Sequence, residues 1–158
     1  MGLTEPTYDV DKRQLEARYK RLQKDLHPDK FGGHDAQQQE YSAEQSSLVN
    51  HAYVKLKSPL QRALYLLERK GKPAPEDGGT ISDPALLMEV MEQRELVEET
   101  TDIGILQVML QENKLLEQAT IENLSQAFKA GELEAAERII TDLRYVTRTG
   151  EAISKKLP

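Results

Sequence analysis

Apolar residues recur along this chain with the spacing of α-helices. A first helix is predicted over residues 11–26, where one stripe repeats at i, i+4, i+7 and i+11: Leu15, Tyr19, Leu22 and Leu26. Pro28 disfavours helical geometry at the preceding residue, so this helix should end at His27. A mobile loop is expected over residues 31–33. A second helix is predicted over residues 37–57, and its apolar face carries Leu48, Val49, Ala52, Tyr53 and Leu56.

The segment KPAPEDGGTIS, residues 72–82, is the clearest domain boundary in the chain, because Pro and Gly interrupt helices and strands. Before it, Pro59 opens a third helix that should end at Gly71. After it, helices are predicted over about 84–99, over about 101–130 and from Glu132 onward, with Gly150 as a candidate interruption. No alternation typical of strands is present. The sequence therefore predicts an all-α fold: a helical hairpin over 1–71, a linker over 72–82 and a three-helix bundle over 83–158.

Charge is unevenly placed along the chain. Residues 1–75 carry 13 Lys and Arg against 10 Asp and Glu, residues 76–158 carry 8 against 17, and the whole chain has a net charge of −6. This asymmetry indicates two surfaces for two different partners. The acidic total argues against nucleic acid, and no apolar run is long enough to span a membrane. The chain has no Cys, which excludes disulfides and thiolate metal sites.

The stretch KDLHPDKFGG places a His-Pro-Asp tripeptide, residues 27–29, where the first helix must stop. It could simply be a turn, since Pro and Asp are common turn residues. A second interpretation is a metal-dependent hydrolytic site, although a loop with two glycines does not preorganise ligands; its members would be His27, Asp29, His34 and Asp35. The third is a surface that another protein recognises. Residues 12–30 hold seven basic and three acidic side chains, and charges of this kind steer association with an acidic partner.

The residues around the tripeptide carry a family resemblance. ARYKRLQKDLHPDK, followed by NHAYVKLKSPLQRALY, resembles the J-domain of DnaJ-type co-chaperones. In that family the HPD loop and a basic helix dock on the ATP-bound form of a 70-kDa heat-shock chaperone and accelerate its ATP hydrolysis, while the J-protein supplies no catalytic group. The resemblance implies a chaperone-binding surface that consists of His27, Pro28, Asp29, Tyr19, Lys20, Arg21 and Lys24.

The segment SDPALLMEVMEQRELVEE, residues 82–99, has more apolar residues than one core-facing stripe requires. Leu86, Val90 and Val97 fall on one side of the predicted helix. A mixed stripe falls on the opposite side, with Leu87 at its edge: Met88, Met91, Glu92 and Glu95. Either both stripes are buried between helices, or the second faces outward as an adaptable protein-binding patch, a role for which Met is suited.

The order of a J-domain, a short linker and DPALLMEVMEQREL resembles the HscB family of J-proteins, which serve iron–sulfur cluster assembly. LRYV, residues 143–146, resembles the last helix of that family, so the similarity runs over nearly the whole chain. The resemblance implies that the C-terminal bundle binds a cluster scaffold protein of the IscU type and brings it to the chaperone, which promotes cluster transfer. The implied scaffold-binding surface consists of Leu87, Met88, Met91, Glu92, Glu95 and Tyr145.

The same resemblance sets further expectations. No cofactor or metal should be needed, and the Cys-rich zinc segment of some relatives is absent. The expected compartment is the mitochondrial matrix, with the bacterial cytoplasm as the alternative, and the N-terminus shows no targeting segment. A J-domain normally begins with a short helix of the type DYYxxLGL. Only Met1, Gly2 and Leu3 stand at that place here, so the first helix is expected to be largely missing. A J-domain co-chaperone for another client is the nearest alternative.

Overall fold

The computed structural model describes residues 7–31, 33 and 35–158. Within these residues the only regular elements are helices, without strands, and the all-α prediction is confirmed. The elements are α1 (Lys12–Leu26), the 3-10 helix η1 (Pro28–Phe31), α2 (Ala36–Lys57), α3 (Pro59–Arg69), α4 (Pro84–Glu99), α5 (Ile103–Ala130) and α6 (Leu133–Lys156). None of the described helices combines the length and the hydrophobicity that crossing a membrane requires.

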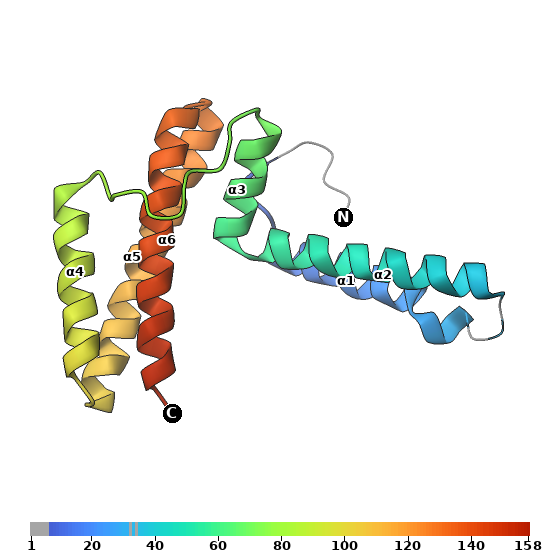
Figure 1. The fold of residues 1–158 in the computed structure, drawn as a ribbon, viewed down its shortest axis with the longest axis horizontal. Helices are drawn as coiled ribbons and strands as arrows, with labels where there is room; N and C mark the ends of the chain where they lie inside the picture. The colour runs from blue at the N-terminus through green and yellow to red at the C-terminus, as the bar shows by residue number, and fades with distance from the viewer. Residues whose placement is uncertain (1–6, 32, 34) are drawn as a thin grey trace. The chain divides into compact units, whose positions relative to one another are not determined.

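The chain divides into two compact units, Met1–Leu66 and Leu67–Pro158, and the division falls inside α3. The domain bounds predicted from the sequence, 1–71, 72–82 and 83–158, rest on composition, whereas the two compact units are defined by contacts between residues. These domain bounds therefore stay a prediction. The first unit holds the α1–α2 hairpin, and the second holds the three long C-terminal helices (Figure 1).

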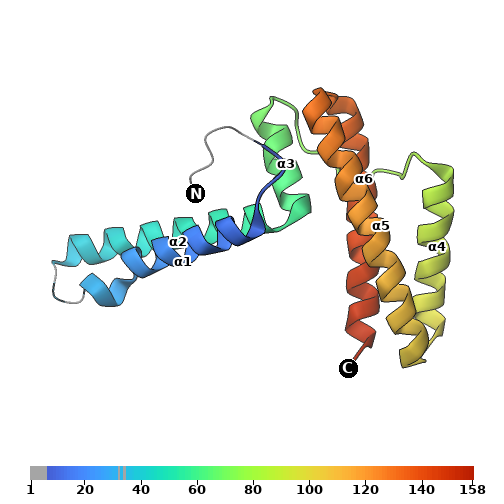
Figure 2. The same cartoon turned by 180° about the vertical axis from the view of Figure 1, so that it is seen from behind.

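Helices α1 and α2 lie side by side and antiparallel (Figures 1 and 2). Asp11 begins α1 as its N-cap, because its carboxylate accepts hydrogen bonds from the N–H groups of Arg13 and Gln14 at 2.9 and 3.1 Å. Between the helices, the ring of Tyr19 stacks on that of Tyr53, with centroids 4.0 Å apart and an interplanar angle of 11°. This aromatic pair fixes the middle of the hairpin.

In the second unit, α5 runs antiparallel to α4 and α6, which run in the same direction (Figures 1 and 2). Two apolar clusters set their register: Ile81, Val90 and Val146 form one, and Val97, Leu106, Met109 and Ile153 form the other. Gly131 makes the turn from α5 to α6 in the left-handed conformation, with φ of 74°, which glycine adopts without steric cost. Val90 and Val97, which the helical periodicity placed on one side of the predicted helix, thus lie in the two clusters of the bundle core.

The candidate interruption at Gly150 is wrong, because α6 continues through it to Lys156. Asn113 of α5 lies so close that a Cβ atom on residue 150 would collide with its Oδ1 atom. The Nδ2 group of Asn113 donates to the carbonyl oxygen of Val146 at 3.1 Å and to Oε1 of Gln93 at 3.4 Å. The glycine therefore allows α5 to approach α6 closely, and Asn113 joins all three helices of the bundle.

The linker segment, residues 72–82, contains no helix but is held along α6. Lys72 pairs with Glu134 at 2.8 Å, and Arg148 pairs with Asp77 at 2.6 Å. Between them, the guanidinium of Arg144 donates to the carbonyl oxygens of residues 75 and 76, at 2.8 and 2.9 Å. These contacts position Ile81 in its apolar cluster and fix where α4 begins.

Candidate functional site

The His-Pro-Asp tripeptide forms a compact turn at the end of α1. His27 is the C-cap, with φ of −61° and ψ of 129°, and η1 starts at the next residue. The backbone N–H of Asp29 donates to Nδ1 of His27 at 3.3 Å, and the Oδ2 atom of Asp29 lies 3.5 Å from the same nitrogen. The imidazole of His27 and the carboxylate of Asp29 therefore contact each other within the turn. Both side chains are nonetheless well exposed, at 57% for His27 and 90% for Asp29.

A mobile loop was expected over residues 31–33, but residue 31 belongs to η1, and residue 32 lies outside the described residues. On the α2 side, the hydroxyl of Ser42 donates to the carbonyl oxygen of Leu26 at 2.6 Å. That carbonyl is one of those that a helix leaves without a partner at its C-terminal end. Ser42 is 2% exposed, so the bond fixes the residue next to His27 from within the hairpin.

The basic residues assigned to the same surface lie along α1. Arg21 and Lys24 are exposed, and Lys20 pairs with Glu16 at 2.7 Å across one helical turn. The hydrogen bond to Glu16 raises the pKa of Lys20. Tyr19 is half-buried, and its hydroxyl donates to Oδ1 of Asn50 at 2.7 Å. The structure thus gives Tyr19 a packing role within the hairpin.

The metal-dependent alternative at this turn is not assembled in the part of the chain that the structure describes. Asp35 caps α2 by accepting a hydrogen bond from the N–H of Gln38 at 2.8 Å. His34 lies outside the described residues. Elsewhere in the described ranges, no three His, Cys, Asp or Glu side chains gather as a metal site would require.

Helix α4 buries one stripe and exposes the other. Val90 and Val97 are 2% and 5% exposed, whereas Met88 and Met91 are 63% and 62% exposed. Glu92 and Glu95 are also exposed. Of the two sequence-based alternatives, the structure favours an outward-facing stripe, which presents flexible apolar side chains between carboxylates.

Leu87 and Tyr145 occupy a different position from the methionines. Both are half-buried, and both pack against the cluster of Ile81, Val90 and Val146. They therefore join the outer face of α4 to α6, which a helical projection of α4 alone does not reveal. We call the six residues of this region the α4–α6 face: Leu87, Met88, Met91, Glu92, Glu95 and Tyr145.

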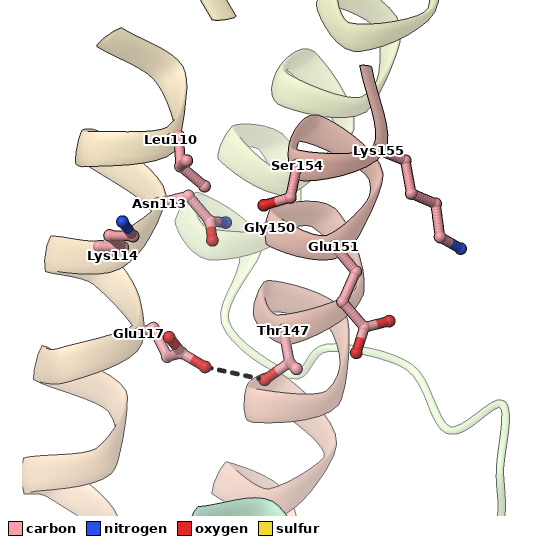
Figure 3. A pocket seen from close by; sticks show the side chains of 9 residues that line it. All are labelled: Leu110, Asn113, Lys114, Glu117, Thr147, Gly150, Glu151, Ser154 and Lys155. Carbon is pink, nitrogen blue, oxygen red and sulfur yellow. Dashed lines mark hydrogen bonds between the residues drawn. The ribbon is translucent and has the colours of Figure 1, made fainter. Parts of the chain in front are cut away.

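An open groove runs between α5 and α6 (Figure 3). Its walls carry charges of both signs, and a hydrogen bond of 3.2 Å joins Thr147 to Glu117 across it. Asn113 and Gly150, which bring these two helices together, also line it. None of the residues predicted to bind a partner contributes to the groove, so it is separate from the α4–α6 face.

Known proteins resemble this chain over nearly its whole length. The family model described as the HSCB C-terminal oligomerisation domain matches residues 82–154. The iron–sulfur cluster co-chaperone protein HscB homolog of Arabidopsis thaliana is 37% identical over 97% of this chain, and the human HscB protein is 34% identical over 96%. This chain spans 60% and 65% of the lengths of those two proteins. The crystal structure of human co-chaperone protein HscB matches with a TM-score of 0.86 and 33% identity, covering 96% of this chain and 77% of that one.

A helical hairpin with a His-Pro-Asp turn between its helices, followed by a bundle of three long helices, is the architecture of a J-type co-chaperone: a J-like domain and a C-terminal bundle. The chain belongs to the HscB family of co-chaperones in iron–sulfur cluster assembly. The family prediction made from the sequence is confirmed.

Proposed function

We propose that this chain stimulates the ATPase of a 70-kDa heat-shock chaperone and delivers an IscU-type iron–sulfur scaffold protein to it. The observation that supports this proposal is that each compact unit exposes one of the two candidate recognition features. The His-Pro-Asp turn lies on the first, and Met88 and Met91 lie on the second. Such a molecule can hold two partners at once without supplying a catalytic group of its own.

The chaperone-binding surface would consist of the turn and the exposed side chains of α1. His27 and Asp29 are held by their mutual contact and by the bond between Ser42 and Leu26. A turn that is rigid before binding loses little conformational entropy on docking. Lys20, Arg21 and Lys24 would steer it toward an acidic surface of the ATP-bound chaperone. Tyr19 and Pro28 would support this surface through the hairpin and the turn.

The scaffold-binding surface would be the α4–α6 face. Met88 and Met91 would fill an apolar depression on the scaffold, and Glu92 and Glu95 would form the polar rim. Leu87 and Tyr145 already pack against the core, so their side chains would lose little conformational entropy when the scaffold binds. The acidic character of residues 76–158 suits a partner with a basic surface.

Holding both partners would raise the effective concentration of the scaffold near the chaperone. ATP hydrolysis would then coincide with capture of the scaffold and favour cluster transfer. The cluster is cargo in this scheme. Similarity to the plant and human proteins supports the mitochondrial matrix as the compartment, with the bacterial cytoplasm as the alternative. A different client is the second candidate function.

The proposal is tested by single-turnover ATP hydrolysis of a 70-kDa heat-shock chaperone with this chain, with and without an IscU-type scaffold. We expect stimulation by the chain alone and further stimulation when the scaffold is added. Stimulation without any effect or binding of the scaffold would point to the other client. A chain that leaves hydrolysis at its basal rate would contradict the chaperone role.

A further inference from the structure

A buried amide faces the open groove between α5 and α6 (Figure 3). Asn113 is 2% exposed, and its Nδ2 group has partners for both of its hydrogens, the carbonyl oxygen of Val146 and Oε1 of Gln93. Among the residues that the structure describes, no group donates to the Oδ1 atom of the same side chain. Because this side chain lines the groove, a ligand in the groove can supply the missing donor.

Gly150 keeps the groove open beside this oxygen. A Cβ atom on residue 150 would collide with Oδ1 of Asn113, so a larger residue would fill the floor of the groove. The groove has a volume of about 440 Å³, which is within the range of sites for small ligands. All of its lining residues belong to α5 and α6, so a ligand here would leave α4 uncovered.

The groups that point into the groove are mainly hydrogen-bond acceptors. On α5, Glu117 follows Asn113 by one helical turn, which places their Cβ atoms roughly 5–6 Å apart on one face. The hydroxyl of Thr147 donates to Oε1 of Glu117 at 3.2 Å, so the carboxylate is held across the groove while only one of its oxygens is engaged. Ser154 points into the same space from α6 (Figure 3). The groove therefore offers a carboxylate, an amide oxygen and a hydroxyl to a donor.

The other charged residues that line the groove lie toward its edges. Figure 3 shows Glu151 and Lys155 extending away from α5, and Lys114 lying farther from α6 than Asn113 does. Glu151 and Lys155 carry opposite charges one turn apart on α6, so their effects on the groove oppose each other. The carboxylate of Glu117 is the charge held between the two helices, and it favours a cation there.

We propose that this groove binds a primary alkylammonium group, carried either by a Lys side chain of another protein or by a free aliphatic diamine. An ammonium between Asn113 and Glu117 would donate to the amide oxygen and to the carboxylate, and it has no acceptor that would be left unpaired. Its alkyl chain would pass over Gly150 and contact Leu110, one turn before Asn113. The α4–α6 face and the His-Pro-Asp turn would stay free, so the site is independent of the proposed function.

Other ligands fit the groove less well. An anion would meet the carboxylate of Glu117 and the amide oxygen of Asn113, both of which are acceptors. A divalent metal such as Ca²⁺ or Mg²⁺ prefers about six oxygen ligands. In the described parts of the chain, no three His, Cys, Asp or Glu side chains are arranged to hold one.

The test is a titration of the whole chain with cadaverine and with Nα-acetyl-lysine methylamide, followed by the amide chemical shifts of Asn113 and Gly150. We expect saturable binding of at least one of these two amines. Glu117→Gln keeps an acceptor for Thr147 but removes the charge, so it should weaken binding by about tenfold. Ser154→Leu, at an exposed position, would place an alkyl side chain in the groove and should block the amines.

Glu122→Gln is the matched control, because it neutralises an exposed carboxylate of α5 outside the groove and should leave the affinity unchanged. Binding of cadaverine alone would assign the site to free amines, and binding of the lysine derivative would assign it to a Lys side chain. Shifts that do not saturate with either amine would overturn the proposal. So would an equal loss of affinity in the Glu117 and Glu122 variants, which would show general attraction of cations to an acidic surface. Equally tight binding of pentanol, which has no charge, would overturn it too.

Discussion

The hydroxyl of Ser42 on α2 donates a hydrogen bond of 2.6 Å to the carbonyl oxygen of Leu26, the last residue of α1. Pro28 prevents α1 from continuing, so this carbonyl has no helical donor. The bond connects two residues 16 positions apart and fixes the backbone next to the His-Pro-Asp turn. The geometry of the turn therefore depends on α2 as much as on its own sequence.

Ser42→Ala should destabilise the hairpin by about 1 kcal/mol, because it leaves the part-buried carbonyl oxygen of Leu26 without its donor. Chemical denaturation followed by circular dichroism measures this change. Chaperone stimulation should fall as well, since the turn loses a constraint. Ser47→Ala, at an exposed position of the same helix, is the control and should leave both unchanged. A stable Ser42→Ala protein would show that the Leu26 carbonyl finds water instead.

His27→Gln should abolish stimulation of the chaperone ATPase while helicity and scaffold affinity stay intact. Glutamine lacks the imidazole ring, so it cannot keep the shape of the ring together with the Nδ1 acceptor that receives the N–H of Asp29. Single-turnover hydrolysis and circular dichroism are the measurements, and His51→Gln, on the exposed side of α2, is the matched control. Normal stimulation by the His27 variant would exclude the turn as the trigger.

Replacing Leu87, Met88 and Met91 together by Ala should weaken scaffold binding by about 2–4 kcal/mol if they form the centre of the contact. Because Leu87 also packs in the core, a Met88→Ala/Met91→Ala variant separates binding from stability. Calorimetry gives the affinity, and thermal unfolding checks the fold. Val108→Ala/Leu115→Ala removes comparably exposed apolar side chains from α5 and should not affect binding. Equal losses in both double variants would argue for unspecific apolar contact.

Gly150→Ala should destabilise the bundle although Ala favours helices by about 1 kcal/mol, because its Cβ would overlap Oδ1 of Asn113. Thermal unfolding should show a lower melting temperature. Adding Asn113→Ala removes the colliding atom, so the double variant should lose less stability than the two single changes predict. If the free-energy changes of unfolding of the two single variants simply add in the double variant, α5 and α6 move apart at this point without strain.

Helix bounds could be read from the sequence because local chemistry sets them. Asp11 and Asp83 satisfy free N–H groups at helix starts, Pro59 fits a first turn, and Gly131 adopts the left-handed conformation that ends α5. The candidate turn could be found in the same way, because a proline after a basic amphipathic helix forces the chain to leave it. Local rules failed at Gly150, where the deciding factor is a side chain 37 residues away, Asn113.

The sequence by itself determined the helices, their apolar stripes, the uneven charge and the residues of both candidate surfaces. Tertiary structure alone decided which of those residues are free to act. Met88 faces outward while Leu87, its neighbour, packs on the same apolar cluster as Tyr145. Asp142 is buried although nothing in its local sequence distinguishes it from an exposed acid. The physical reason is that periodicity fixes which positions share a helix face. Exposure and the energy of a charge depend instead on which other helix covers that face.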